Sequence, residues 1–104
     1  VPVLTTAPGD PATPDYWTGQ IVEPVRFADA VRRAHAMGAT RFLELGPDGA
    51  LSALVPYIAQ DTTAIPVLRP GPDEAASLLH GIARAHVHGT PADWAAPLHA
   101  AGVP

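Results

Sequence analysis

The sequence predicts an α/β fold with mainly parallel strands flanked by helices. Short apolar runs of strand-like composition alternate with segments whose apolar residues recur at helical spacing, and this alternation favours parallel pairing across helical crossovers. Thirteen prolines and nine glycines break the chain often, so each element should be short. Three short strands do not make a well-covered sheet alone. We therefore expect the fold to be incomplete on its own, with its strands completing a larger sheet.

The first part of the chain is predicted to hold a strand, a loop and two helices. Residues 1–5 have the composition of a short strand, and residues 6–15 form a loop because they contain three prolines and a glycine. Asp15 is expected to cap a short helix that runs to about Val22. From Val25 to Met37 the apolar residues mark one face of a second helix, and the glycine that follows is suited to end it.

The middle of the chain is predicted to be a strand, a turn, a helix and a second strand. Residues 41–45 are apolar enough for a buried strand, and the turn Gly-Pro-Asp-Gly follows. A helix of about two turns is expected over residues 51–58, interrupted or shifted by Pro56. Residues 62–68 have the β-branched bias of a strand.

The longest helix is predicted near the C-terminal end of the sequence. Pro72 or Asp73 should begin it, and its apolar stripe runs to about His88, where a glycine ends it. Residues 90–104 are rich in proline and alanine, so we expect a linker that packs through Trp94.

Composition narrows the class of protein. The chain has 104 residues, 47% of them hydrophobic, and a net charge of −4 without any lysine, which argues against nucleic-acid binding. The absence of cysteine excludes disulfides and thiol chemistry. No apolar run approaches the roughly 20 residues that cross a bilayer, and no signal peptide is recognisable. We expect a cytoplasmic protein.

Because the sequence opens on Val1 without a methionine and closes on HAAGVP without a finishing element, we also expect a piece of a longer chain.

The stretch FLELGPDGAL, residues 42–51, is a strand, a turn and the start of a helix. Such turns can hold an anion on free backbone N–H groups, but Pro47 lacks one, and the pattern matches neither dinucleotide-binding nor P-loop glycine motifs. A plain β–α turn, with glycine supplying a positive φ angle, explains it better. Glu44 lies in the strand either on an exposed face or paired with an arginine, although burial would make it a functional candidate.

No self-contained catalytic or metal site is predicted. Neither Ser52 nor Ser77 stands in a G-x-S-x-G elbow, and both fall inside predicted helices. His86 and His88 do not share a helical face, and no histidine pair has the four-residue spacing of a helical metal site. We expect surface or boundary histidines.

Residues 16–54 carry the most specific pattern, an aromatic pair, a short turn, P-V-x-F, a helix, a strand ending in E-x-(G/S)-P and a leucine-containing helix. The matching positions are Tyr16, Trp17, Pro24, Val25, Phe27, Glu44, Gly46, Pro47 and Leu51. This pattern resembles the C-terminal part of the acyltransferase domain of modular type I polyketide synthases. VPVLTT is similar to the family's preceding strand. Residues 64–94 are similar to its last strand and helix, leading into a post-acyltransferase linker that contains Asp93-Trp94.

The resemblance implies an α/β-hydrolase-like acyltransferase core over residues 1–89 and a linker over 90–104. In that family a serine of a G-H-S-x-G elbow, activated by a histidine, takes a malonyl or alkylmalonyl group from CoA, and an arginine pairs with the free carboxylate. The acyl group then passes to the phosphopantetheine thiol of an acyl carrier protein. All three side chains would lie upstream of Val1, so the chain alone is predicted to be inactive and to bind no cofactor or metal.

One site residue follows from the resemblance. Gln20 matches the position whose backbone carbonyl accepts a hydrogen bond from the catalytic histidine, which fixes the orientation of the ring. A plain turn residue is the alternative. The implied partners are the rest of the acyltransferase, the ketosynthase and the acyl carrier protein. The turn after Glu44 should then support the segment that presents Gln20. Two other functions stay open, a non-catalytic acyltransferase remnant that serves as a docking module and an unrelated small ligand-binding domain.

Overall fold

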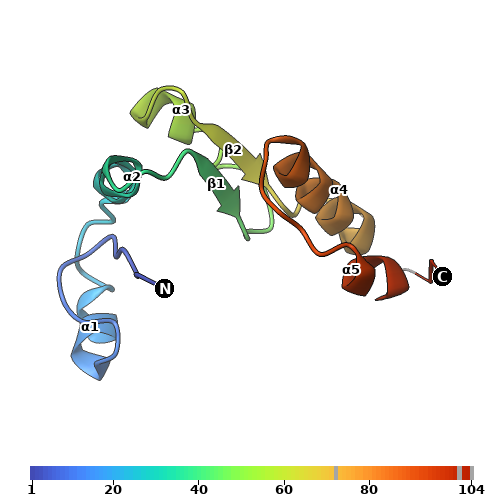
Figure 1. Ribbon diagram of the computed structural model, residues 1–104. Coiled ribbons are helices and arrows are strands. Elements are labelled where there is room, and N and C mark those ends of the chain that lie inside the picture. The colour runs from blue at the N-terminus through green and yellow to red at the C-terminus, as the bar shows by residue number, and fades with distance from the viewer. Residues whose placement is uncertain (72, 101, 104) are drawn as a thin grey trace. The chain divides into compact units, whose positions relative to one another are not determined.

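A computed structural model describes residues 1–71, 73–100 and 102–103 (Figure 1). The chain divides into two compact units, Val1–Ala39 and Thr40–Pro104. The first unit holds helices α1 and α2, and the second holds β1, α3, β2, α4 and α5 in that order. In the described part of the chain, no helix combines the length and the apolar character that crossing a membrane requires.

Helix α1 spans Pro14–Gly19, so it begins before Asp15 and not after it. Thr13 occupies the N-cap, and proline opens the first turn because its missing N–H needs no partner there. The predicted cap is therefore wrong. Asp15 lies inside the first turn, where its negative charge interacts favourably with the helix dipole.

Residues 1–5 form no strand, contrary to the prediction. Instead, the start of α2 and its last turn hold this segment: the Arg33 guanidinium donates to the Thr5 carbonyl oxygen at 2.5 Å, and the Arg26 N–H donates to the Thr6 carbonyl at 2.9 Å. A strand needs a neighbouring ladder, and the described residues of this unit contain no strand that could supply one.

Helix α2 spans Phe27–Ala36, which confirms the helix predicted from Val25 to Met37. Val31 lies in its buried face, at 4% exposure. Gly38 ends the helix as predicted, because its φ of 98° is a left-handed conformation that glycine adopts without strain, and its N–H donates to the His35 carbonyl at 2.9 Å.

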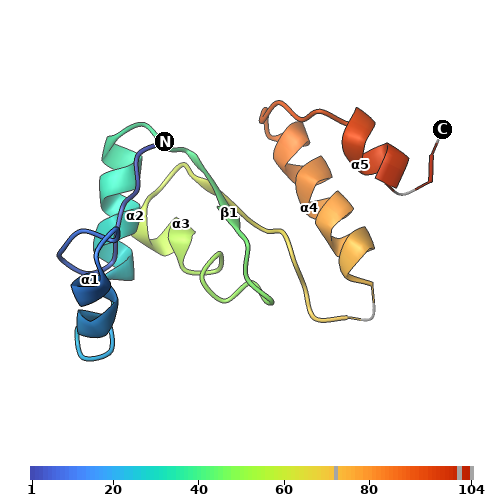
Figure 2. The same ribbon diagram turned by 90° about the horizontal axis from the view of Figure 1, so that it is seen from below.

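The second unit contains a two-stranded sheet of β1, Arg41–Glu44, and β2, Thr63–Pro66. The strands are parallel, as predicted, and the register pairs Leu43 with Ile65. Helix α3, Val55–Ile58, lies in the crossover between them (Figure 2). It is shorter than the predicted helix over 51–58, because Pro56 sits in its first turn and residues 51–54 form turns instead.

The core of this unit forms where β2 meets α4, Glu74–Val87. Ile65 and Val67 are almost completely buried, and α4 contributes Gly81 and Ala85 to the same interior. A Cβ atom placed on Gly81 would lie 2.8 Å from the Val67 Cα. The helix therefore approaches the end of the strand backbone to backbone.

Helix α4 confirms the longest predicted helix. Asp73 is its N-cap, and its carboxylate accepts a hydrogen bond from the Ala76 N–H at 2.8 Å. Pro72, the alternative first residue, lies outside the described residues. Gly89 follows the end of the helix with a φ of 89°, as its predicted role as a terminator requires.

A further helix, α5, spans Ala95–Ala100 in the segment predicted to be a linker. The Asp93 carboxylate accepts from the Ala95 N–H at 2.9 Å and so satisfies one free donor at the start of this helix. Trp94 packs as predicted: its ring meets the His86 ring edge to face, with the centroids 5.5 Å apart.

Candidate functional site

Glu44 organises the turn that follows β1. Its Oε2 atom accepts a hydrogen bond from the Ser52 N–H at 2.7 Å, and its Oε1 atom accepts from the Leu51 N–H at 3.3 Å. Its backbone carbonyl accepts from the Val67 N–H at 3.0 Å, which extends the strand pairing. One residue thus joins β1 to the turn and to the segment after β2.

The surroundings of Glu44 favour its ionised form. Partial desolvation raises the pKa of the carboxyl, but the hydrogen bonds from the Ser52 hydroxyl and N–H and from the Leu51 N–H together outweigh it, so the pKa lies below its ordinary value. The predicted ion pair with arginine is absent from the described residues, so that alternative is wrong, and the side chain is neither fully exposed nor fully buried. The partners of the half-buried carboxylate are hydroxyl and backbone N–H groups in the following turn.

The glycines of the turn serve close approach and not a left-handed backbone. Neither Gly46 nor Gly49 has a positive φ angle, so the predicted reason for glycine is wrong. A Cβ on Gly46 would lie 3.3 Å from Glu44 Oε1, and one on Gly49 would lie 3.1 Å from the Pro66 Cβ. Side chains at these positions would displace the carboxylate or the end of β2.

The turn does not offer its N–H groups to an external anion. The Ala50 N–H donates to the Asp48 carboxylate at 3.1 Å, and the next two N–H groups donate to Glu44. The protein's own carboxylates therefore occupy the place where a bound anion would lie. The geometry supports the β–α turn and leaves no phosphate cradle.

Gln20 follows α1 directly and is half-buried. Its N–H donates to the Tyr16 carbonyl at 3.0 Å, and its side-chain amide donates to the Tyr16 hydroxyl. Tyr16 is itself buried at 8% exposure, and its ring meets Trp17 edge to face at 5.2 Å. The Trp17 ring N–H donates to the Pro11 carbonyl at 2.9 Å, so the aromatic pair fixes this end of the helix.

The backbone carbonyl of Gln20 accepts no hydrogen bond from any of the described residues. The neighbouring N–H groups of Val22 and Glu23 both donate to the Gly19 carbonyl at 3.0 Å. The carbonyl that the resemblance assigns to histidine orientation therefore lies between hydrogen-bonded neighbours and is free to accept a hydrogen bond.

The serines and histidines do not assemble into a nucleophilic site within the described ranges. Ser52 is buried in the turn before α3, not in a helix as predicted, and Ser77 in α4 donates to the Val67 carbonyl at 3.4 Å. The His35 Nδ1 atom lies 3.1 Å from the Ala39 carbonyl oxygen. Residues 1–71, 73–100 and 102–103 contain no group of three or more acidic or histidine side chains that could hold a metal ion.

Comparison with known proteins gives relatives along most of the chain. It is 47% identical over 87 residues to the Polyketide synthase GfsA of Streptomyces halstedii, covering 79% of this chain. It is 37% identical over 110 residues to the Spectinabilin polyketide synthase system protein NorB of Streptomyces orinoci, covering 90%. It is 42% identical over 83 residues to the Mycoketide-CoA synthase of Mycobacterium tuberculosis, covering 78%.

The chain is homologous to a segment of polyketide synthases. It spans 1%, 5% and 2% of the lengths of these three polyketide synthase relatives. No family model and no solved structure matches the chain. The polyketide synthase part of the predicted resemblance is thus supported by relatives from several bacteria.

Sequence reasoning missed the two interactions that shape the second unit. In the sequence, the Glu44 contacts correspond only to an acidic residue followed eight residues later by a serine. This spacing predicts no contact, because the two residues meet only once the turn has folded back over the strand. The role of Gly81 had a weak signal, since glycine inside a helical stripe costs stability and usually has a packing reason.

Proposed function

We propose that the chain is the C-terminal portion of a polyketide synthase acyltransferase domain that loads a malonyl or alkylmalonyl extender unit from CoA onto an acyl carrier protein. The observation that carries the proposal is the ordered pattern of residues 16–54, which lies within a chain whose relatives are polyketide synthases. Residues 1–89 are assigned to an α/β-hydrolase-like core and residues 90–104 to the linker that follows it.

The chemistry proceeds on residues outside the chain. A serine hydroxyl, deprotonated by a histidine, attacks the thioester carbonyl of the acyl-CoA, and the CoA thiol leaves with a proton. The phosphopantetheine thiol of the carrier protein then attacks the acyl-serine ester, which releases the serine hydroxyl. The chain binds no cofactor of its own in this scheme, and its partners are the rest of the domain, the ketosynthase and the carrier protein in the cytoplasm.

Gln20 is the positioning residue that this segment contributes. Its free backbone carbonyl is suited to accept the histidine Nδ1–H, which fixes the tautomer in which Nε2 takes the serine proton. Because a main-chain atom accepts the bond, Gln20→Asn should keep acyl transfer within about threefold. A fall of about a hundredfold, with the protein still folded, would show that the side chain acts instead.

Large exposed apolar side chains are consistent with a further domain or protein that covers them. Ile21, Val22 and Val25 in the first unit and Leu45 and Tyr57 in the second are 70–90% exposed. Within each unit, large apolar side chains left exposed favour contact with a partner surface. The rest of an acyltransferase would cover them, but so would a ketosynthase or carrier protein if the chain is a non-catalytic docking module, which is the alternative function.

Intact-mass spectrometry of the whole protein under denaturing conditions tests the proposal. Parallel samples receive malonyl-CoA, methylmalonyl-CoA, or acetyl-CoA as a control that lacks the free carboxylate. The proposal expects a covalent acyl adduct with one of the first two, on a polypeptide that contains a G-H-S-x-G elbow. The absence of both adduct and elbow would overturn it in favour of the docking module.

A further inference from the structure

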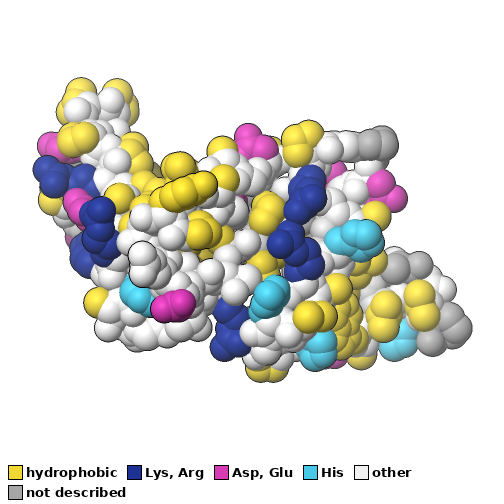
Figure 3. Space-filling model, turned by 90° about the horizontal axis from the view of Figure 1, so that it is seen from above, with side chains coloured by type: hydrophobic (Ala, Val, Ile, Leu, Met, Phe, Trp, Pro, Cys, Tyr) yellow, Lys and Arg dark blue, Asp and Glu magenta, His cyan; other side chains and the backbone are white. Residues whose placement is uncertain are grey.

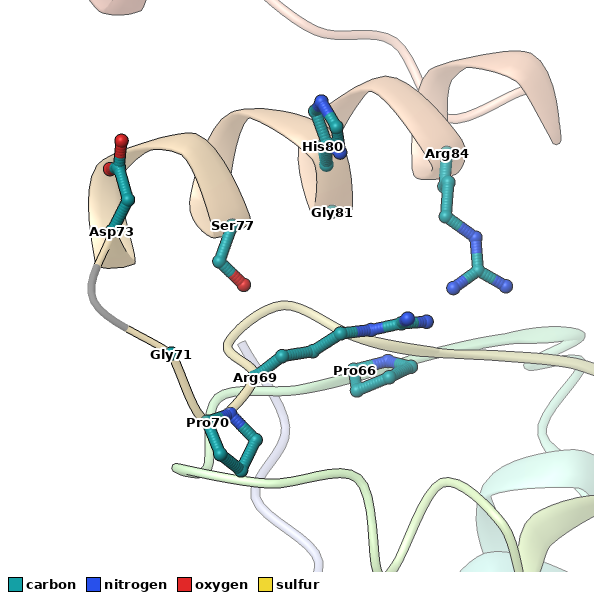
Figure 4. Close-up of a pocket in the computed structure, with 9 residues that line it drawn as sticks. All are labelled: Pro66, Arg69, Pro70, Gly71, Asp73, Ser77, His80, Gly81 and Arg84. Carbon is teal, nitrogen blue, oxygen red and sulfur yellow. The ribbon is translucent and has the colours of Figure 1, made fainter.

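A pocket of about 310 Å³ lies between the loop after β2 and one face of α4 (Figure 4). The loop contributes Arg69 and its neighbours, and the helix contributes Ser77, Gly81 and Arg84. These three helical positions share a face because they are separated by four and three residues. Gly81 allows α4 to lie against Val67, and this close packing brings the polar face of the helix over the loop.

The donors of this pocket converge. In Figure 4 the guanidinium groups of Arg69 and Arg84 reach toward the same end of the pocket, and the Ser77 hydroxyl points into it. The Ser77 hydroxyl donates to the Val67 carbonyl only at 3.4 Å, a long contact that leaves it able to turn toward a ligand. His80 points away from the pocket in the same view.

No carboxylate of the described residues forms an ion pair with either arginine, although Asp48 and Glu74 line a neighbouring pocket beside Arg69. The ion pairs found in the described ranges all involve Asp29, in the other unit. Asp73 is the one acidic lining residue; its carboxylate caps α4 through the Ala76 N–H and lies at the far end of the pocket, pointing away. On the space-filling view, arginine and histidine side chains lie close together over α4 (Figure 3). Both arginines are exposed, so solvent screens their mutual repulsion in part, and an anion between them would relieve what remains.

We propose that this pocket binds a phosphate group. Donors that approach from two chain segments and a hydroxyl suit a tetrahedral oxyanion, whereas a planar carboxylate is satisfied by one arginine fork. The volume is at the lower limit of the roughly 300 to 1,000 Å³ typical of small-molecule sites. It is therefore larger than an inorganic ion needs and suits a phosphate ester. The proposal rests on the pocket alone and does not depend on the proposed acyl transfer.

Hydrogen–deuterium exchange of the intact protein localises the binding. The probes are inorganic phosphate, CoA and pantetheine, which has the same thiol arm without any phosphate, all at equal ionic strength set with chloride. Exchange in peptides covering residues 69–84 should slow with CoA and not with pantetheine. If inorganic phosphate slows exchange as much as CoA does at equal concentration, the ligand is the free ion. If CoA slows exchange more, the ligand is a phosphate ester. Both outcomes support the proposal.

Three variants make the test specific. Arg69→Gln and Arg84→Gln should each weaken the apparent affinity for the phosphate probe about tenfold or more, as the loss of a charge-assisted hydrogen bond implies. Arg32→Gln removes the same charge from the other unit, where that side chain pairs with Asp29, and should change the affinity less than about twofold. Protection that survives both pocket variants, equal protection by pantetheine, or no protection by any probe would overturn the proposal. Because the readout is local to residues 69–84, these outcomes are independent of whether an acyl adduct forms.

Discussion

Replacing Gly81 with alanine adds one methyl group where α4 lies against the end of β2. In the middle of a helix this change is ordinarily favourable by about 1 kcal/mol, because glycine loses more backbone freedom on folding. Here the added Cβ would lie 2.8 Å from the Val67 Cα and 3.1 Å from both its Cγ1 and its carbonyl oxygen. The nearest atom belongs to the backbone, so no side-chain rotation relieves the contact.

The magnitude follows from the distance. Ordinary contact begins at 3.4 Å, so the helix must move away from Val67 by about 0.6 Å, the difference between 3.4 and 2.8 Å. Overpacking of this kind costs about 1 to 3 kcal/mol. After the helix-propensity gain is subtracted, Gly81→Ala should destabilise the contact between α4 and β2 by about 0 to 2 kcal/mol.

Amide hydrogen exchange in the intact protein measures this local stability. Faster exchange is expected in the amides of α4 and of residues 63–67. Gly19→Ala is the matched control, because it lies at the end of α1 with nothing within 4 Å of the added Cβ, and it should not destabilise its helix. If Gly81→Ala instead slowed exchange in α4 by the amount that a helix-propensity gain of about 1 kcal/mol implies, the inferred close packing of α4 on β2 would be wrong.

The remaining predictions concern the turn after β1 and the contact of Trp94 with α4. Because the pKa of Glu44 is lowered in the folded chain, its carboxylate contributes stability above the ordinary pKa of 4.5, and this contribution is lost as the pH falls through the folded pKa; Glu44→Gln should flatten the acid side of a stability-versus-pH curve. Gly46→Val should displace the Glu44 carboxylate and lower both stability and acyl transfer of the intact protein, whereas Gly71→Val, with nothing within 4 Å, should leave stability unchanged in thermal melts; unaffected transfer in Gly46→Val would count against a supporting role for the turn. Trp94→Ala should remove about 1 kcal/mol of packing against His86 and speed exchange in residues 95–100; unchanged exchange there would show that α5 is held by other contacts.

Periodicity and chain breakers were sufficient to predict the interior elements. The stripe of α2, the start of α4 near Asp73 and the parallel pairing of β1 with β2 follow from local patterns and from the need for a crossover. The wrong predictions concern segments whose structure depends on contacts with other parts of the chain and not on the local sequence pattern. Residues 1–5 have strand composition but lack a ladder in their unit, and α5 forms around Pro97 because the Asp93 carboxylate satisfies a donor at its start.

The candidate site was less predictable from the sequence than the fold. What distinguishes a binding site is whether its polar groups already have hydrogen-bond partners within the chain, and only the structure shows this. The sequence favoured a plain β–α turn over an anion site because Pro47 lacks an N–H, and the structure adds that Asp48 and Glu44 accept from the N–H groups that an anion would need. Sequence order cannot reveal this, since the pairing depends on how the turn folds over the strand. The Gln20 carbonyl and the convergent guanidinium groups of Arg69 and Arg84 have no partner in the described part of the chain. Arg69 and Arg84 are exposed and Gln20 is half-buried, so water can solvate these groups, but each presents a hydrogen-bonding group that a ligand or a neighbouring domain can still engage. The N–H groups of the turn after β1 are already engaged, so we expect a partner outside the chain at the former groups and not at the turn.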